Sequence, residues 1–289
     1  MDAFLHQVVA GLATGGIYAA VALALVMIYQ STHLVNFAQG EMAMFSTYIA
    51  WALIEGGMPY WVAFAITVGV SLGVGILIQR FVIRPVSNAS VLTVVVVFIG
   101  LLAIFNAVAG WIWSHTIKSF PSPFPEKPIF GSLISNHEMG TLGVTLVVLI
   151  LLYVFFRFTP LGLAMRAAAQ NPVSSRLVGV RVGWMLALGW GLAAAIGAVA
   201  GMMVAPIVYL DPNMMAGILL YGFASALIGG IDNPWGAVLG GFIVGVLENV
   251  LGAYVIGTEL KLTVALVIIV AVLTVKPSGL FGKVIVTRV

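Results

Sequence analysis

The chain has 289 residues, of which 62% are hydrophobic and 7% are charged. Soluble domains carry roughly 25% charged residues, so this sequence lacks the polar side chains that a water-facing surface requires. The composition therefore excludes an ordinary soluble domain and predicts an all-α polytopic membrane protein. Cysteine is absent, which excludes disulfides and thiolate metal sites. The formal net charge of +3 is too small to indicate nucleic-acid binding.

The first apolar stretch, Phe4 to Ile28, resembles a signal peptide only superficially. It has no basic segment before it, and its length of about 25 residues exceeds that of a typical signal sequence. We therefore interpret it as a membrane span that is retained.

Apolar segments recur along the whole chain, and a helix needs about 20 such residues to cross the hydrocarbon core. The segments cover residues 4–29, 40–56, 60–83, 91–113, 141–158, 184–208, 214–231, 235–256 and 260–276. The second, fifth, seventh and ninth are short, and short or broken segments often line a site in the membrane. We expect eight or nine membrane segments in a single transmembrane domain of residues 1–289.

The basic residues predict the orientation of the chain. If the segments alternate, nine of the twelve Lys and Arg residues fall on one side. These are Arg80, Arg84, Arg157, Arg166, Arg176, Arg181, Lys276, Lys283 and Arg288. Cytoplasmic loops are enriched in basic residues, so this side is predicted to be the cytoplasm and the C-terminus to lie there. The side of the N-terminus depends on whether the crossings number eight or nine.

Two loops differ in character. Residues 114–140 contain Pro121, Pro123, Pro125 and Pro128, which predicts a partly extended extracytoplasmic loop, because proline blocks regular helix.

The second loop, residues 159–183, contains a short helix signal. Thr159 can cap the helix, Pro160 suits its first position, and the Ala-rich run that follows has high helix propensity. Asn171, which precedes a proline, ends it. We predict a stiff helix in a cytoplasmic loop, followed by a turn or two near residues 174–178.

Polar residues between the first two spans form the first candidate site. Asn36 can cap the next helix, and Glu41 lies near the positive helix N-terminus, with Gln39 between them. Tyr18 lies earlier, within the first span. One interpretation is that these residues only fix a tight turn. The other is that they line a gate or passage.

Glycines near both ends of the chain predict close helix packing, because small residues let helix backbones approach. They are Gly15, Gly16, Gly229, Gly230, Gly236, Gly240 and Gly241. Ion coordination by the neighbouring Asp232 is less favoured, since no second carboxylate is near it in sequence.

Glu248 and Asn249 lie within an apolar segment. A glutamate in the membrane normally faces protein or water, so these residues either line the passage or bond a neighbouring helix. Glu259 and Lys261 are expected to lie in a solvated loop.

The sequence shows no recognisable metal-binding or catalytic motif. Three histidines, His33, His115 and His137, show no metal-ligand spacing, so we expect no metal. The sequence contains no Walker A motif or nucleophile elbow, which predicts a chain that is not an enzyme and does not hydrolyse ATP itself.

At this point four motifs resemble those of bacterial ABC permeases of the branched-chain amino-acid (LIV/HAAT) type. They are residues 15–19 with 35–41, residues 160–180, residues 226–241 and residues 276–282. The match covers nearly the whole chain in the family's order. One departure is Gln39, where the family often has His, which weakens any protonation role there.

The resemblance implies a permease subunit of an ATP-driven importer for branched-chain or related amino acids, in the bacterial inner membrane. It implies a second, usually non-identical permease, a periplasmic binding protein, and two cytoplasmic ATPases that carry ATP and Mg. This chain itself would bind no cofactor. The loop 159–183 would be the coupling loop, with Pro160, Leu161, Gly162, Arg166, Ala167, Asn171 and Gly179 contacting an ATPase.

Other functions remain as alternatives. A gradient-driven secondary transporter would use a titratable group such as Glu41 or Glu248. A channel is suggested by the Asn-Pro pairs at Asn171 and Asn233, although basic residues around Asn171 place it outside the membrane. A membrane enzyme is disfavoured by the lack of clustered ligands or nucleophiles. Leucine, isoleucine and valine are the first expectation for the substrate; other amino acids, urea, short amides and aromatic acids remain open.

Overall fold

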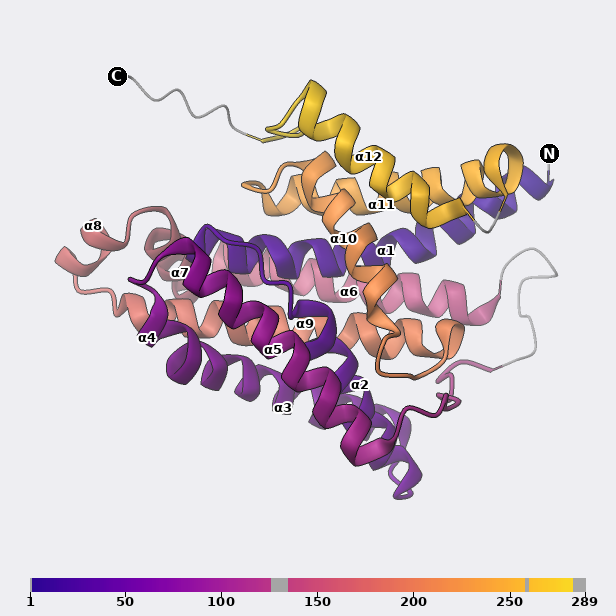
Figure 1. Cartoon of the computed structure of the whole chain (residues 1–289), viewed down its shortest axis with the longest axis horizontal. Coiled ribbons are helices and arrows are strands. Elements are labelled where there is room, and N and C mark those ends of the chain that lie inside the picture. The colour runs from indigo at the N-terminus through magenta and orange to yellow at the C-terminus, as the bar shows by residue number, and fades with distance from the viewer. Residues whose placement is uncertain (1, 126–134, 258–259, 283–289) are drawn as a thin grey trace. The chain divides into compact units, whose positions relative to one another are not determined.

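The computed structural model describes residues 2–125, 135–257 and 260–282 (Figure 1). All regular elements among them are helices, which confirms the predicted all-α fold. An isolated β-bridge pairs Lys118 with Leu210 through two backbone hydrogen bonds of 2.9 Å.

The helices follow one another along the chain, with two π-helical turns among them. They are α1 (Asp2–Thr32), α2 (Gln39–Glu55), α3 (Tyr60–Ile78), η1 (Gln79–Ile83), α4 (Arg84–Val86), α5 (Val91–Trp113), α6 (Asn136–Phe158), α7 (Pro160–Gln170), α8 (Pro172–Leu177), α9 (Val182–Val208), α10 (Met215–Gly229), α11 (Pro234–Leu251), η3 (Gly252–Ile256) and α12 (Lys261–Val275).

Each apolar segment of the sequence forms a helix. Within the described residues, six helical runs are long and apolar enough to cross a membrane, and α3, η1 and α4 together form one of them. The fifth segment was expected to be short, but its helix α6 has 23 residues because it begins earlier, at Asn136. Helices α2, α10 and α12 have 17, 15 and 15 residues and are shorter than a full crossing.

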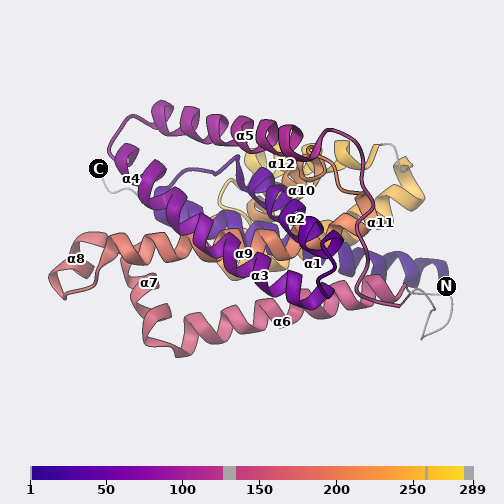
Figure 2. The ribbon, with the colours of Figure 1, turned by 90° about the horizontal axis from the view of Figure 1, so that it is seen from below.

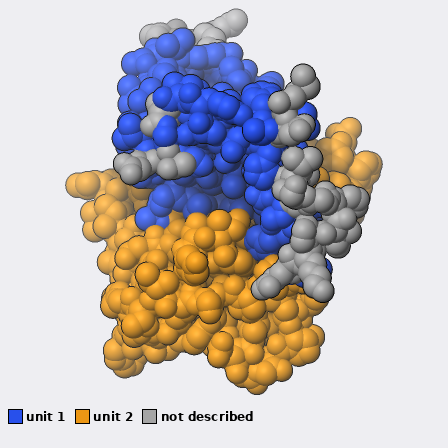
Figure 3. Space-filling view, turned by 90° about the vertical axis from the view of Figure 1, so that its right-hand side faces the viewer, with its two compact units in different colours: residues 1–26, 124–143, 216–289 blue, residues 27–123, 144–215 orange. Residues whose placement is uncertain are grey.

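The chain divides into two compact units, which Figure 3 shows in different colours. Unit 1 contains residues 1–26, 124–143 and 216–289, and unit 2 contains residues 27–123 and 144–215. The predicted single domain of residues 1–289 stays a prediction. In the predicted extracytoplasmic loop, residues 126–134 lie outside the described residues, as do Glu259, Lys283 and Arg288.

In unit 2, glycines bring helix backbones into direct contact. A Cβ on Gly75 of α3 would lie 2.6 Å from the carbonyl oxygen of Trp190 in α9. Likewise, a Cβ on Gly201 of α9 would lie 2.9 Å from the carbonyl oxygen of Ala43 in α2. Helices that approach this closely associate through backbone van der Waals contact, which larger side chains would prevent.

In unit 1, α1 and α11 meet in the same way. A Cβ on Gly15 would lie 2.9 Å from the Cα atom of Phe242, and one on Gly245 would overlap the backbone of Gly15. Gly241 faces Ala19 of α1, and Gly240 faces the Ser225 carbonyl of α10. These contacts give α1, α10 and α11 backbone-to-backbone interfaces.

The turn between α10 and α11 holds the segment that follows α12. The amide of Leu280 donates to the Ile228 carbonyl at 2.7 Å, and the Asn233 side chain donates to the Phe281 carbonyl at 3.1 Å. Gly230 has a φ of +102°, and a Cβ there would lie 2.6 Å from the Gly282 nitrogen. Only glycine combines this backbone conformation with this close approach. Gly229 packs in the same turn against Gly236.

Candidate functional site

In unit 1, a carboxylate and a tyrosine from distant parts of the sequence form a buried pair. The hydroxyl of Tyr18, in α1, donates a 2.6 Å hydrogen bond to the Glu248 carboxylate in α11. The ring of Tyr18 also stacks on Tyr221 of α10, with 4.7 Å between the ring centroids. The pair therefore connects three helices of this unit.

Lys261 extends this polar cluster. Its ammonium nitrogen lies 3.8 Å from the Glu248 carboxylate and donates to the Asn249 side-chain oxygen at 3.4 Å. Asn249 in turn donates to the Thr14 hydroxyl of α1 at 3.0 Å. The expectation that Lys261 lies in a loop was wrong, because it begins α12 and faces the acid of another helix; its side chain is still 26% exposed.

This arrangement gives Glu248 a structural role between helices. Its charge has a basic partner and a short hydrogen bond, so the cost of placing it within apolar helices is offset locally. Of the two interpretations drawn from the sequence, the contacts favour a bond to neighbouring helices.

In unit 2, the polar residues around the start of α2 are buried. Asn36 was expected to cap this helix. The structure places Ala38 at the cap instead, and the Asn36 side-chain oxygen accepts a hydrogen bond from the Ala38 amide at 3.0 Å. This hydrogen bond already occupies the Asn36 side-chain oxygen before the helix begins, so the oxygen does not cap α2. Gln39 donates from its side-chain nitrogen to the Ala193 carbonyl of α9 at 3.0 Å.

Several buried polar atoms of α2 have no hydrogen-bond partner within the described residues. They are the side-chain oxygen Oε1 of Gln39, Oε2 of Glu41 and the hydroxyl of Tyr48. An unpaired polar atom in an apolar environment is costly, so such atoms mark places where a polar ligand gains by binding. The acid Glu41 lies in the first turn of α2, where the helix dipole favours a negative charge.

Sequence reasoning missed one residue of this group. Asn106, in α5, interacts electrostatically with Glu41 and donates from its side-chain nitrogen to the Pro212 carbonyl at 2.9 Å. Asn106 is a single polar residue in an apolar segment, and this isolation was the only feature of the sequence that could have indicated a role for it.

The helix predicted after Thr159 is present as α7. The Thr159 hydroxyl accepts from the Gly162 amide at 3.0 Å, and Pro160 opens the helix. A Cβ on Gly162 would lie 2.7 Å from the Cα atom of Phe156, so only glycine fits the tight turn from α6 into α7. In Figure 2, α7 turns back from the end of α6 and α8 leads into α9.

One face of α7 is anchored. Met165 and Ala168 are buried against Val182 and Met185 at the start of α9. Asn171 ends α7 and caps α8 by accepting from the Ser174 amide at 2.9 Å. The predicted second turn after Asn171 is therefore confirmed.

The other face of α7 and α8 is apolar but exposed. Leu163, Leu177 and Val178 are 60%, 85% and 79% exposed, with Arg166 beside them also exposed. Gly179, with a φ of +85°, turns the chain back toward α9. We refer to Leu161, Leu163, Val173, Leu177 and Val178 as the α7–α8 apolar patch.

Known proteins resemble this chain over nearly its full length. The family described as "Branched-chain amino acid transport system / permease component" matches residues 7–273. This chain belongs to that permease family. The permease LivH of Salmonella typhimurium, named as part of a high-affinity branched-chain amino acid transport system, is 29% identical over 97% of this chain and 96% of its own length. The corresponding protein BraD of Pseudomonas aeruginosa is 30% identical over the same shares. A probable LivH of Methanocaldococcus jannaschii is 28% identical over 90% of this chain and 87% of its own length.

As a member of the branched-chain permease family, the chain is a multi-pass membrane protein and a permease component of a transport system. The matched region includes both polar groups and the α7–α8 pair.

Proposed function

We propose that this permease is the membrane-spanning subunit of an ATP-driven importer for branched-chain or related amino acids, in the bacterial inner membrane. Membership of the permease family and the named relatives support the substrate class. The basic loops support a cytoplasmic C-terminus and a cytoplasmic position for α7 and α8.

The observation that carries the proposal is the α7–α8 apolar patch. It lies on helices of 11 and 6 residues that are too short to cross a membrane, yet it exposes several large apolar side chains. Apolar patches exposed outside the membrane mark contacts with other proteins. A helix whose opposite face is packed on α9 can pass the movement of a bound partner to the membrane helices as a rigid body.

The partners follow from this arrangement. We propose that one of two ATPase subunits docks on the α7–α8 apolar patch. These subunits would hold ATP and Mg, because this sequence has no nucleotide-binding motif. A second permease, in a heterodimer, would complete the passage. A periplasmic binding protein would deliver the substrate and make most of the selection. On this assignment the chain is not itself an enzyme and binds no cofactor.

Within the chain, Glu41 is the strongest candidate for contact with the substrate. An amino acid carries an ammonium group, which a carboxylate oxygen without a partner can accept. Gln39 and Tyr48 offer further unpaired polar atoms on the same helix. Tyr18, Glu248 and Asn249 are bonded to one another or to other helices and are assigned to holding unit 1 together.

Reconstitution tests the proposal. The chain is co-expressed with the subunits encoded beside it, and the purified complex is placed in proteoliposomes. One preparation has the binding protein inside the vesicles, and a second preparation has it outside. We expect uptake of labelled leucine, isoleucine or valine that requires both ATP and the binding protein. Uptake driven by a proton or sodium gradient without ATP would instead support a secondary transporter. A complex that contains no ATPase would also overturn the proposal.

A further inference from the structure

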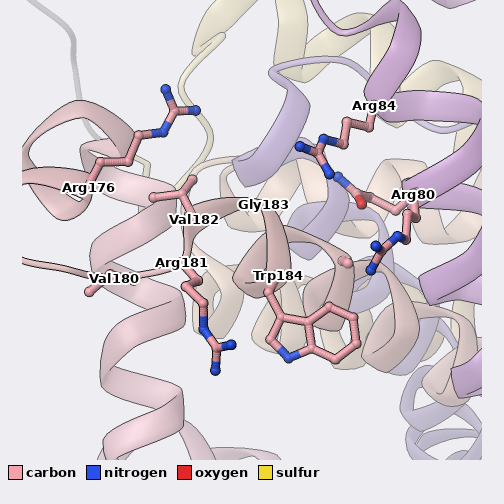
Figure 4. Close-up of a pocket in the computed structure, with 10 residues that line it drawn as sticks. Arg80, Arg84, Arg176, Val180, Arg181, Val182, Gly183 and Trp184 are labelled. Carbon is pink, nitrogen blue, oxygen red and sulfur yellow. The ribbon is translucent and has the colours of Figure 1, made fainter.

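Four arginines of unit 2 surround one cavity of about 400 Å³ (Figure 4). Arg80 and Arg84 reach it from the helical run that continues α3, Arg176 from the last turn of α8, and Arg181 from the position just before α9. All four are exposed. Neither polar group described above includes any of them, and none of them belongs to the α7–α8 apolar patch.

The positive charge in this cavity is not balanced by the acidic residues of unit 2. The acids of unit 2 are Glu41, Glu55 and Asp211, and none of them lines the cavity. Within the described residues, none of the four guanidinium groups has a carboxylate partner. Several uncompensated arginines around one opening attract an anion, and the planar guanidinium group suits the paired oxygens of a phosphate.

A second observation also points to a ligand. Gln79 is buried, 6% exposed, and lines both this cavity and an adjoining one of about 540 Å³. Its side-chain oxygen has no hydrogen-bond partner among the described residues. The cavity wall therefore offers guanidinium donors and one unpaired acceptor, the side-chain oxygen of Gln79. A ligand with an anionic group and a hydroxyl would satisfy both, because the anion accepts from the arginines and the hydroxyl donates to Gln79.

The length of the helical run that continues α3 favours a place for Arg80 and Arg84 near the membrane surface. The run Tyr60–Val86 has 27 residues, or about 40 Å of helix, whereas the hydrocarbon core is about 30 Å thick. Counted from Tyr60, about 20 residues span the core, so Arg80 and Arg84 fall beyond it. The π-helical turn η1 lies here too, and such turns frequently occur at functional sites.

Apolar side chains flank the arginines on the same run. Leu77 and Phe81 are 53% and 68% exposed, and Trp184 at the cavity is 41% exposed. Tryptophan is enriched at the boundary between lipid and water. A free anion or an acidic protein segment would use only the charges, whereas a phospholipid would also cover this apolar surface with its acyl chains.

We propose that this cavity binds the headgroup of an anionic phospholipid. The phosphate lies among the four guanidinium groups, and a headgroup hydroxyl, as in phosphatidylglycerol, donates to Gln79. Basic pockets between membrane helices commonly hold such headgroups. The proposal depends on the membrane-spanning fold and not on the transported substrate, so failure of one leaves the other standing.

Native mass spectrometry of the detergent-purified transporter complex tests the site. Dioctanoyl phosphatidylglycerol, dioctanoyl phosphatidylcholine and inorganic phosphate are titrated separately, and the adducts on this subunit are counted. We expect saturable binding of phosphatidylglycerol that is at least about tenfold tighter than that of phosphatidylcholine or phosphate, a difference of about 1.4 kcal/mol. Binding of phosphate as tight as that of the lipid would show a site for free anions and overturn the proposal.

Matched arginine variants locate the binding. The double variant R80Q/R84Q is expected to weaken phosphatidylglycerol binding about tenfold or more, and R176Q, in the last turn of α8, is expected to weaken it as well. The control is R157Q, because Arg157 is also exposed and basic but does not line the cavity. An equal loss in R157Q, or no loss in the double variant, would contradict the site. All these arginines are exposed, so folding of the variants is expected to be preserved.

Discussion

The hydroxyl of Tyr18 in α1 and the carboxylate of Glu248 in α11, two residues 230 positions apart in the sequence, form a hydrogen bond of 2.6 Å. We expect Tyr18→Phe to lower the free energy of unfolding by about 1–3 kcal/mol, because it leaves a buried carboxylate oxygen without its donor. Thermal unfolding of the purified protein in nanodiscs measures this loss.

The control for this prediction is Tyr254→Phe, because the Tyr254 side chain is exposed. It removes the same hydroxyl and should change stability little. The double variant Tyr18→Phe/Glu248→Gln should lose less than the sum of the single losses, since the two groups interact. Additive losses would mean that the hydrogen bond does not contribute to stability.

The contact between α1 and α11 predicts a steric effect at Gly245. A Cβ there would overlap the backbone of Gly15, so Gly245→Ala should destabilise the protein by about 1–3 kcal/mol and reduce its yield in membranes. Gly217→Ala is the matched control within α10, because a Cβ there meets no atom within 4 Å. Alanine also favours helix by up to about 1 kcal/mol over glycine. Equal stability of the two variants would contradict close packing at Gly245.

The exposed position of Arg166 predicts that transport can be uncoupled from ATP hydrolysis. We expect Arg166→Glu to leave assembly intact but to lower the substrate transported per ATP by roughly tenfold, through loss of a contact worth about 1.4 kcal/mol. Parallel assays of ATPase activity and labelled leucine uptake in proteoliposomes measure this ratio.

Arg157→Glu provides the comparison, since Arg157 is exposed in the last turn of α6 and lies outside α7. An unchanged ratio in Arg166→Glu would argue against a coupling role. Gly162 is less suited to this test, because a Cβ there collides with the Phe155 carbonyl and would disturb the turn itself.

The unpaired oxygen of Glu41 predicts an effect on substrate binding. We expect Glu41→Gln to raise the KM for uptake about tenfold or more, because a hydrogen bond to a charged group contributes about 1.5–3 kcal/mol. Glu55→Gln, at the other end of α2 and more exposed, should leave KM unchanged. Equal KM values for Glu41→Gln and the unmodified protein would remove Glu41 from the passage.

Local signals in the sequence were sufficient to predict the helices. The cap at Thr159 and the stop at Asn171 predicted α7 within a residue or two, because helix ends depend on neighbouring backbone groups. The nine apolar segments all form helices, since burial in lipid leaves few other options for the backbone.

Contacts between side chains from distant segments of the sequence could not be predicted in the same way. Glu248 was recognised as a buried acid, but nothing nearby in sequence identified Tyr18 or Lys261 as its partners. Asn36 matched the residue preference of a helix cap, yet its side chain bonds the Ala38 amide in the preceding turn. Both outcomes depend on tertiary packing, which local patterns do not specify.

The boundaries between the two units have a consequence for dissecting the protein. Unit 1 is made of three stretches of chain, and three of its four boundaries fall inside helices: after Val26 in α1, after Gly143 in α6 and after Met215 at the start of α10. No single cut separates the units, and a cut after Val26 or after Gly143 would break a continuous ladder of helical hydrogen bonds. Split versions and chimaeras of this permease should therefore be joined in the turns between helices, and neither unit can be exchanged between relatives as one contiguous cassette.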